Sequence, residues 1–196
     1  MKAADLLASR HRNPRARAAI AIGYCACIIL IVAATAAYMH SRRPAGDLLV
    51  AGYALNSFHD ALKFSDTGDP LMFNESANSA LVRVGMFQES DSARRLPKIS
   101  AEFATGALCL SVASQIDLAA SRAETIPLDA VWDFERVQAT MPDVAARMRS
   151  TEGTPTLGQM RAVTDELMRR LKIATENIDA EVDRRYATLR GTTPQR

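Results

Sequence analysis

The sequence is poor in the residues that build catalytic and metal sites. Its 196 residues include three histidines and three cysteines, and they contain no HExxH motif, no CxxC motif and no glycine-rich phosphate loop. His11 and His40 stand on opposite sides of a long apolar segment, so they cannot join His59 in one metal site. His59 is next to Asp60, and consecutive helix positions do not face each other. These observations predict no cofactor, no metal and no enzymatic activity.

Signals for β-strands are also scarce. No stretch keeps an alternation of apolar and polar residues, and no Asn-Gly or Asp-Gly dipeptide marks a hairpin turn. The sequence therefore predicts an all-α fold. The helical segments lack the aromatic and glycine pattern of tetratricopeptide repeats, and no resemblance to a known family is seen.

One apolar segment, residues 18–39, dominates the chain. It contains 22 residues without a charged side chain. As a helix it would be roughly 33 Å long at 1.5 Å per residue, enough to cross a hydrocarbon layer of about 30 Å. We expect a transmembrane signal-anchor helix that contacts the lipid bilayer.

The charges around this segment predict its orientation. Residues 1–17 carry five basic residues and one acidic residue, whereas the fifteen residues after the segment carry only Arg42, Arg43 and Asp47. Basic residues stay on the cytoplasmic side, which predicts a cytoplasmic tail at 1–17 and an extracytoplasmic domain beyond an inner (cytoplasmic) membrane. Residues 41–196 hold 19 of the 24 basic and 21 of the 22 acidic residues, and this negative balance disfavours nucleic-acid binding.

Two other readings of the apolar segment remain open. A cleavable signal peptide would be cut near Ala36, where Ala34-Thr35-Ala36 supplies a small-x-small site, but the preceding apolar run is longer than usual. A lipoprotein would carry its lipid on Cys27, but the apolar run continues a further dozen residues past that position. Cys25 also lies in the segment. Cys109, the remaining cysteine, has apolar neighbours and is predicted to be buried, although a bridge between two copies is an alternative.

Residues 44–190 are predicted to form an antiparallel bundle of about five to six helices. Prolines precede the helix-favouring segments, as they do at first helical turns. The expected segments are 44–65, 70–90, 97–123, 127–139 and 155–190, with a short turn at 143–149 and a disordered end at 191–196. Gly68 and Asp69 are predicted to end the first of these helices and cap the second. The third is the most apolar, and we expect it to be the central helix. The helix at 127–139 holds the single tryptophan, Trp132, which with Asp133 and Arg136 fits a core anchor beside an ion pair better than a ligand-binding cluster.

The last segment, 155–190, is the longest, and its apolar residues recur with a mean spacing of about 3.6. That spacing is typical of a straight helix on a globular core. Charged residues dominate its end: Glu176, Asp179, Asp183, Arg184 and Arg185. The three acids share one face, but Lys172 and the two arginines interrupt it, so a solvated charge stripe is favoured over a cation site. We expect these five residues to be partner contacts.

The expected function is accordingly a single-pass, membrane-anchored helical interaction protein, an accessory or structural subunit of a membrane or envelope assembly. Its partners would be other membrane or envelope proteins, and a homo-oligomer is an alternative. Two alternatives remain: a membrane-tethered ligand-sensing bundle, and a secreted soluble binding protein released near Ala36.

Overall fold

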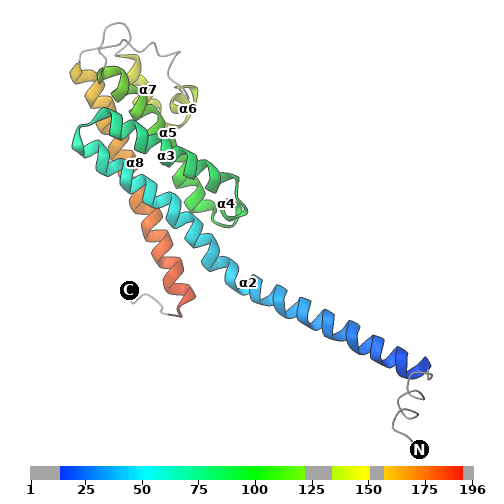
Figure 1. Ribbon diagram of the computed structural model, residues 1–196. Coiled ribbons are helices and arrows are strands. Elements are labelled where there is room, and N and C mark those ends of the chain that lie inside the picture. Colours follow the sequence, from blue (N-terminus) through cyan, green and yellow to red (C-terminus); the bar gives the residue numbers. More distant parts are fainter. Residues whose placement is uncertain (1–13, 122–133, 151–156, 192–196) are drawn as a thin grey trace, which may run out of the picture. The chain divides into compact units, whose positions relative to one another are not determined.

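The computed structural model describes residues 14–121, 134–150 and 157–191, and over these ranges the chain is helical without strands (Figure 1). The all-α prediction is confirmed. The chain consists of two compact units, Met1–Pro44 and Ala45–Arg196.

The first described helix, α2, runs from Pro14 to Thr67 and belongs to both units. It continues through Pro44, so the apolar segment and the helix predicted at 44–65 form one element of 54 residues. Gly68 ends it with φ of 72°, a left-handed conformation that costs glycine little. The predicted stop at Gly68 is confirmed.

Helix α3, Pro70–Glu89, begins where the sequence predicts. The Asp69 carboxylate accepts hydrogen bonds from the backbone N–H groups of Leu71 at 3.0 Å and Met72 at 3.2 Å, and Pro70 occupies the first turn. Phe87 is buried on the inner side of this helix, whereas the neighbouring Met86 is 68% exposed. A five-residue helix that was not predicted, α4, follows at Asp91–Arg95.

Helix α5, Pro97–Ser121, contains ten buried residues, more than any other described helix. It packs against α3 and against α8, which runs from Leu157 to Leu189. By length and composition α5 is also a candidate membrane span. Half of its most apolar stretch is buried, however, as in the core helix of a globular domain. The burial of this helix supports its predicted central position.

Two short helices lie between α5 and α8: α6 at Phe134–Thr140 and α7 at Pro142–Arg149. The predicted turn at 143–149 is wrong, because Val144, Ala145 and Met148 are buried at helical spacing. Pro142 fits the first turn of that helix. Trp132 and Asp133 lie outside the described residues, as do Thr154 and Pro155. Gly191 follows α8 with φ of 70°, as predicted for its end.

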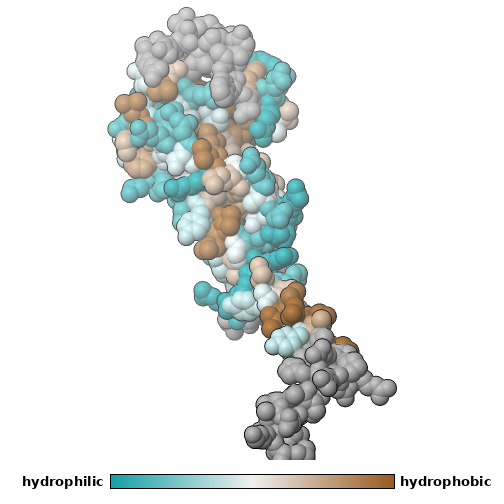
Figure 2. Space-filling model, turned by 45° about the vertical axis from the view of Figure 1, so that its right-hand side comes forward, coloured by the Kyte–Doolittle hydropathy of each residue, from teal (hydrophilic) through white to brown (hydrophobic). Residues whose placement is uncertain are grey.

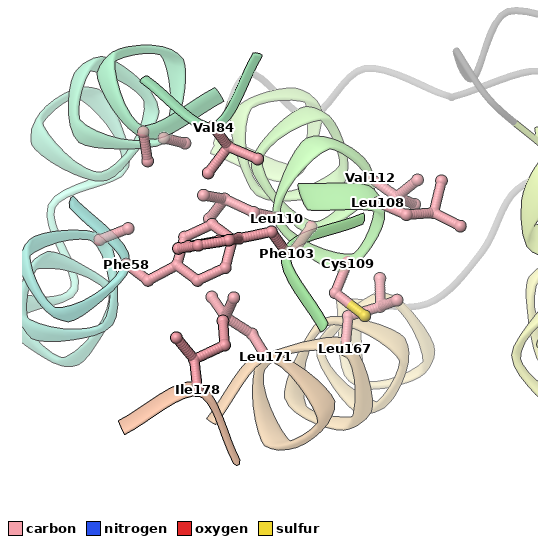
Figure 3. Close-up of a cluster of buried hydrophobic side chains, with 14 of the residues drawn as sticks. Phe58, Val84, Phe103, Leu108, Cys109, Leu110, Val112, Leu167, Leu171 and Ile178 are labelled. Carbon is pink, nitrogen blue, oxygen red and sulfur yellow. The ribbon is translucent and has the colours of Figure 1, made fainter. Parts of the chain in front are cut away.

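The core of the second unit joins side chains from α2, α3, α5 and α8 (Figure 3). Phe103 of α5 contacts Phe58 of α2 with ring centroids 5.4 Å apart and Phe87 of α3 with centroids 4.9 Å apart. Gly106 lies one turn beyond Phe103, and a Cβ atom there would come within 2.5 Å of Phe58 Cε2. The missing side chain is therefore what lets α2 approach α5 at this level.

Candidate interaction surfaces

The apolar part of α2 leaves its side chains uncovered. Of the described residues at 22–39, the large apolar ones are all more than half exposed: Ile22, Tyr24, Ile28, Ile29, Leu30, Ile31, Val32, Tyr38 and Met39. Figure 2 shows apolar side chains gathered on α2 in the lower part of the picture. By length and composition this helix is a candidate membrane span, and none of its most apolar window is buried. Uncovered apolar surface of this extent is typical of a segment that lies in lipid or against a partner.

Two hydroxyl groups, one within this segment and one just after it, form hydrogen bonds within the helix. The Thr35 hydroxyl donates to the carbonyl of Ile31 at 2.8 Å, and the Ser41 hydroxyl donates to the carbonyl of Tyr38 at 2.8 Å. A polar group in hydrocarbon needs such an internal partner. The Arg42 guanidinium lies 5.4 Å from the centre of the Tyr38 ring, an arrangement suited to the boundary between lipid and water.

The five residues predicted as partner contacts lie on the C-terminal half of α8. Glu176 and Asp183 are exposed, and Asp183 lines a shallow hollow of about 340 Å³ with Tyr186, Ala187 and Arg190. Asp179 is partly exposed, and its Oδ2 lies 3.1 Å from His59 Nε2 on α2. The sequence predicts that these residues lie close together on one helix, but it does not show that Asp179 contacts another helix.

Arg184 and Arg185 share one acid that the sequence analysis did not single out. Glu181 accepts from Arg184 Nη2 at 2.6 Å and Nε at 3.0 Å, and from Arg185 Nε at 2.8 Å. The hydrogen bond from Arg184 is the main reason that the pKa of Glu181 is lowered. The side chain of Glu181 is 14% exposed and that of Arg184 is 54% exposed, so the acid is covered by its bases. One acid with two bases leaves a net positive group at this point of the helix.

The same arrangement occurs fifteen residues earlier on α8. Glu166 accepts from Arg169 at 2.7 and 2.9 Å and from Arg170 at 2.8 Å, and these bonds, that of Arg169 first, lower the pKa of Glu166 to about 2. Here the second arginine also bonds to Asp143 of α7. The repeat, Glu-x-x-Arg-Arg, is visible in the sequence and would have revealed both clusters.

The Glu166 and Glu181 clusters differ in the residues that they contact outside α8. In the first, Arg170 connects α8 to another helix through Asp143. In the second, within the described part of the chain, both arginines bond only to Glu181 of their own helix. An arginine has five N–H donors, so Arg184 and Arg185 retain donors for an acid outside this chain. The Glu181 cluster thus resembles the Glu166 cluster but contacts no second helix among the described residues, and it is suited to binding a partner.

A third polar cluster is structural. The side chain of Asp47 is 9% exposed, and it accepts from Arg95 Nε at 2.7 Å, from Arg95 Nη2 at 2.8 Å and from the Ser92 hydroxyl at 2.7 Å. These bonds attach α4 to α2. The partners are 45 and 48 positions apart in the sequence, and no local pattern indicates the contact.

Among the described residues, no group of three or more His, Cys, Asp or Glu side chains is placed to hold a metal ion. Comparison with family models, with curated proteins and with solved structures finds no match. The function is therefore argued from the surfaces alone.

Proposed function

We propose that this chain is a single-pass membrane protein whose helical domain binds other membrane or envelope proteins as an accessory or structural subunit of their assembly. The observation that carries the proposal is the exposure of the apolar side chains at 22–39, in a helix that continues into a packed unit. Such a helix is stable in a bilayer, where it would anchor the packed unit that follows it in the chain.

The proposed topology has residues 1–17 in the cytoplasm and residues 44–190 outside the inner membrane as an antiparallel bundle of five to six helices. The charge difference across the apolar segment supports this orientation. The packing of α5 against α3 and α8 supports the bundle. The partner-binding surface is the end of α8, where Arg184 and Arg185 keep hydrogen-bond donors and Glu176 and Asp183 face solvent.

A native gel of the C-terminally tagged chain, gently solubilised from its own membranes, tests the assembly role. We expect a discrete band far above the 21.3 kDa of the chain itself. A monomer, or a soluble form shortened by the first 36 residues, would refute it and favour the sensing or secreted alternatives.

A charge swap tests the α8 surface. Asp183→Lys combined with Arg184→Glu keeps the net charge, and we expect it to reduce the high-mass band at least fivefold while circular dichroism stays unchanged. The matched control swaps two exposed charges on α6 and α7, Glu135→Lys with Arg147→Glu, and should leave the band intact. Equal effects of the two swaps would show that the end of α8 is not the binding surface.

A further inference from the structure

A groove between α2 and α3 combines an acidic centre with apolar ends. Its centre is a hollow of about 250 Å³ lined from α2 by Ser57, Asp60 and Phe64, and from α3 by Met72, Glu75, Ser76 and Ser79. The two helices are joined by the tight connection at Gly68 and Asp69, so they run alongside each other (Figure 1). The lining contains two carboxylates and no basic side chain.

The apolar ends follow from helical periodicity. On α2, Val50 and Tyr53 precede Ser57 and Asp60 at spacings of three and four, and on α3, Val82 and Met86 follow Ser79 at the same spacings. These four residues are 40%, 63%, 64% and 68% exposed, and Leu71 at the other end is 66% exposed. By this spacing, exposed large apolar side chains lie on the same helix faces as the residues that line the hollow.

We propose that this groove binds a helical segment of a partner protein that carries a Lys or Arg between apolar residues. The charge of the groove decides the chemistry: Asp60 and Glu75 attract a cation, whereas the flanking side chains bury apolar surface. From Val50 to Phe64 the groove is roughly 21 Å long at 1.5 Å per residue, the length of a partner helix of about 14 residues. The basic residue would lie near the middle of that helix, with apolar residues three or four positions away.

This inference rests on the proposed interaction role, but it uses a surface separate from the end of α8. Membrane lipid is a poorer occupant, because anionic lipid headgroups would be repelled by the two carboxylates. A second copy of the chain is also a poorer occupant, because the groove requires a basic helix with an apolar face. The exposed bases of α8 do not meet this requirement, since they lie next to acids.

The test uses the full chain in lipid nanodiscs and a displayed library of 14-residue helical peptides. We expect enriched peptides to carry Lys or Arg with apolar residues three or four positions away. Measured by fluorescence anisotropy, Asp60→Asn with Glu75→Gln should weaken their binding about three- to tenfold, the range for two partly exposed ion pairs. Val82→Asp should weaken it at least tenfold. The control, Glu135→Gln with Asp165→Asn, removes two exposed carboxylates that belong to neither proposed binding surface and should leave binding unchanged.

Three results would overturn the proposal. The first is an enriched set without a basic residue, and the second is equal binding to the wild type and to both groove variants. The third comes from a photo-crosslinking residue in place of Val82: efficient crosslinks to a second copy or to lipid would identify a different occupant. Because the peptides are tested on the purified chain, failure here leaves the native-gel result standing, and the reverse also holds.

Discussion

Replacing Gly106 by alanine is the sharpest test of the packing between α2 and α5. In an exposed helix the change would stabilise the protein by about 1 kcal/mol, because alanine has the better helix propensity. At this position the added Cβ would lie 2.5 Å from Cε2 and 2.9 Å from Cζ of Phe58, and 3.2 Å from Cδ1 of Leu171. Carbon atoms normally rest about 3.5–4.0 Å apart, so the Phe58 ring would have to move by about 1 Å.

The ring has little room for that movement. Phe58 is fully buried and meets the edge of Phe103 at 5.4 Å between centroids, while Leu171 closes the other side of Gly106. Overpacking of this kind costs about 1–3 kcal/mol, and the fixed ring places the cost near the upper end. Subtracting the propensity gain leaves a net loss of about 2 kcal/mol. For a chain of this size the loss lowers Tm by about 4–8 °C.

Gly85→Ala is the matched control, since Gly85 also lies inside a helix but has no heavy atom within 4 Å of its added Cβ. We expect Gly85→Ala to raise Tm by about 2–4 °C and Gly106→Ala to lower it, both measured by circular dichroism on the detergent-solubilised chain. Adding Phe58→Leu to Gly106→Ala should recover part of the loss. If Gly106→Ala raised Tm as much as its control, the close approach of α2 to α5 would be wrong.

Two further variants probe the buried charges. Asp47→Asn removes the charge that Arg95 and Ser92 surround. We expect it to lower the free energy of unfolding, measured by denaturant titration, by about 1–2 kcal/mol; the loss is limited because the half-exposed Arg95 can rehydrate. An unchanged free energy of unfolding would show that the contact does not stabilise the fold. Glu166→Gln tests a pH dependence: the folded pKa of about 2 lies below the ordinary 4.5, so the charged form stabilises the fold above about pH 4.5 and this contribution is lost as the pH falls towards 2. The difference in Tm between wild type and Glu166→Gln should therefore shrink from pH 7 to pH 3, and a constant difference would contradict the assignment.

Helix starts and stops were predictable because they depend on local chemistry. Asp69 caps α3 and Gly68 ends α2 through interactions within a few residues, and the apolar spacing of α8 matches its buried residues from Met160 to Val182. The short helices were harder. Helix α4 has five residues and α7 has eight, beginning with Pro142, and both are too short to show a clear helical period.

The contacts of the candidate surfaces were less predictable. His59 and Asp179 are 120 positions apart, and Asp47 is 48 positions from Arg95, so only the packed chain brings them together. The charges of α8 were visible in the sequence. The sequence does not show that Arg184 and Arg185 cover Glu181, because this contact depends on the rotamers of the side chains. The groove between α2 and α3 was missed because each of its walls, taken alone, is an ordinary mixed helix face.

The burial of Cys109 makes the reactivity of its thiol depend on whether the chain is folded. Its thiol is fully buried and donates to Met141 Sδ at 3.7 Å, and removal from water is the main reason that its pKa rises to about 11. At pH 7 about one molecule in ten thousand then carries the reactive thiolate at this position, so burial protects Cys109 from oxidation in the folded chain. The same thiol is unprotected while the chain is unfolded. Folding must therefore be faster than the reaction of the Cys109 thiol with a small disulfide or with a second unfolded copy of the chain.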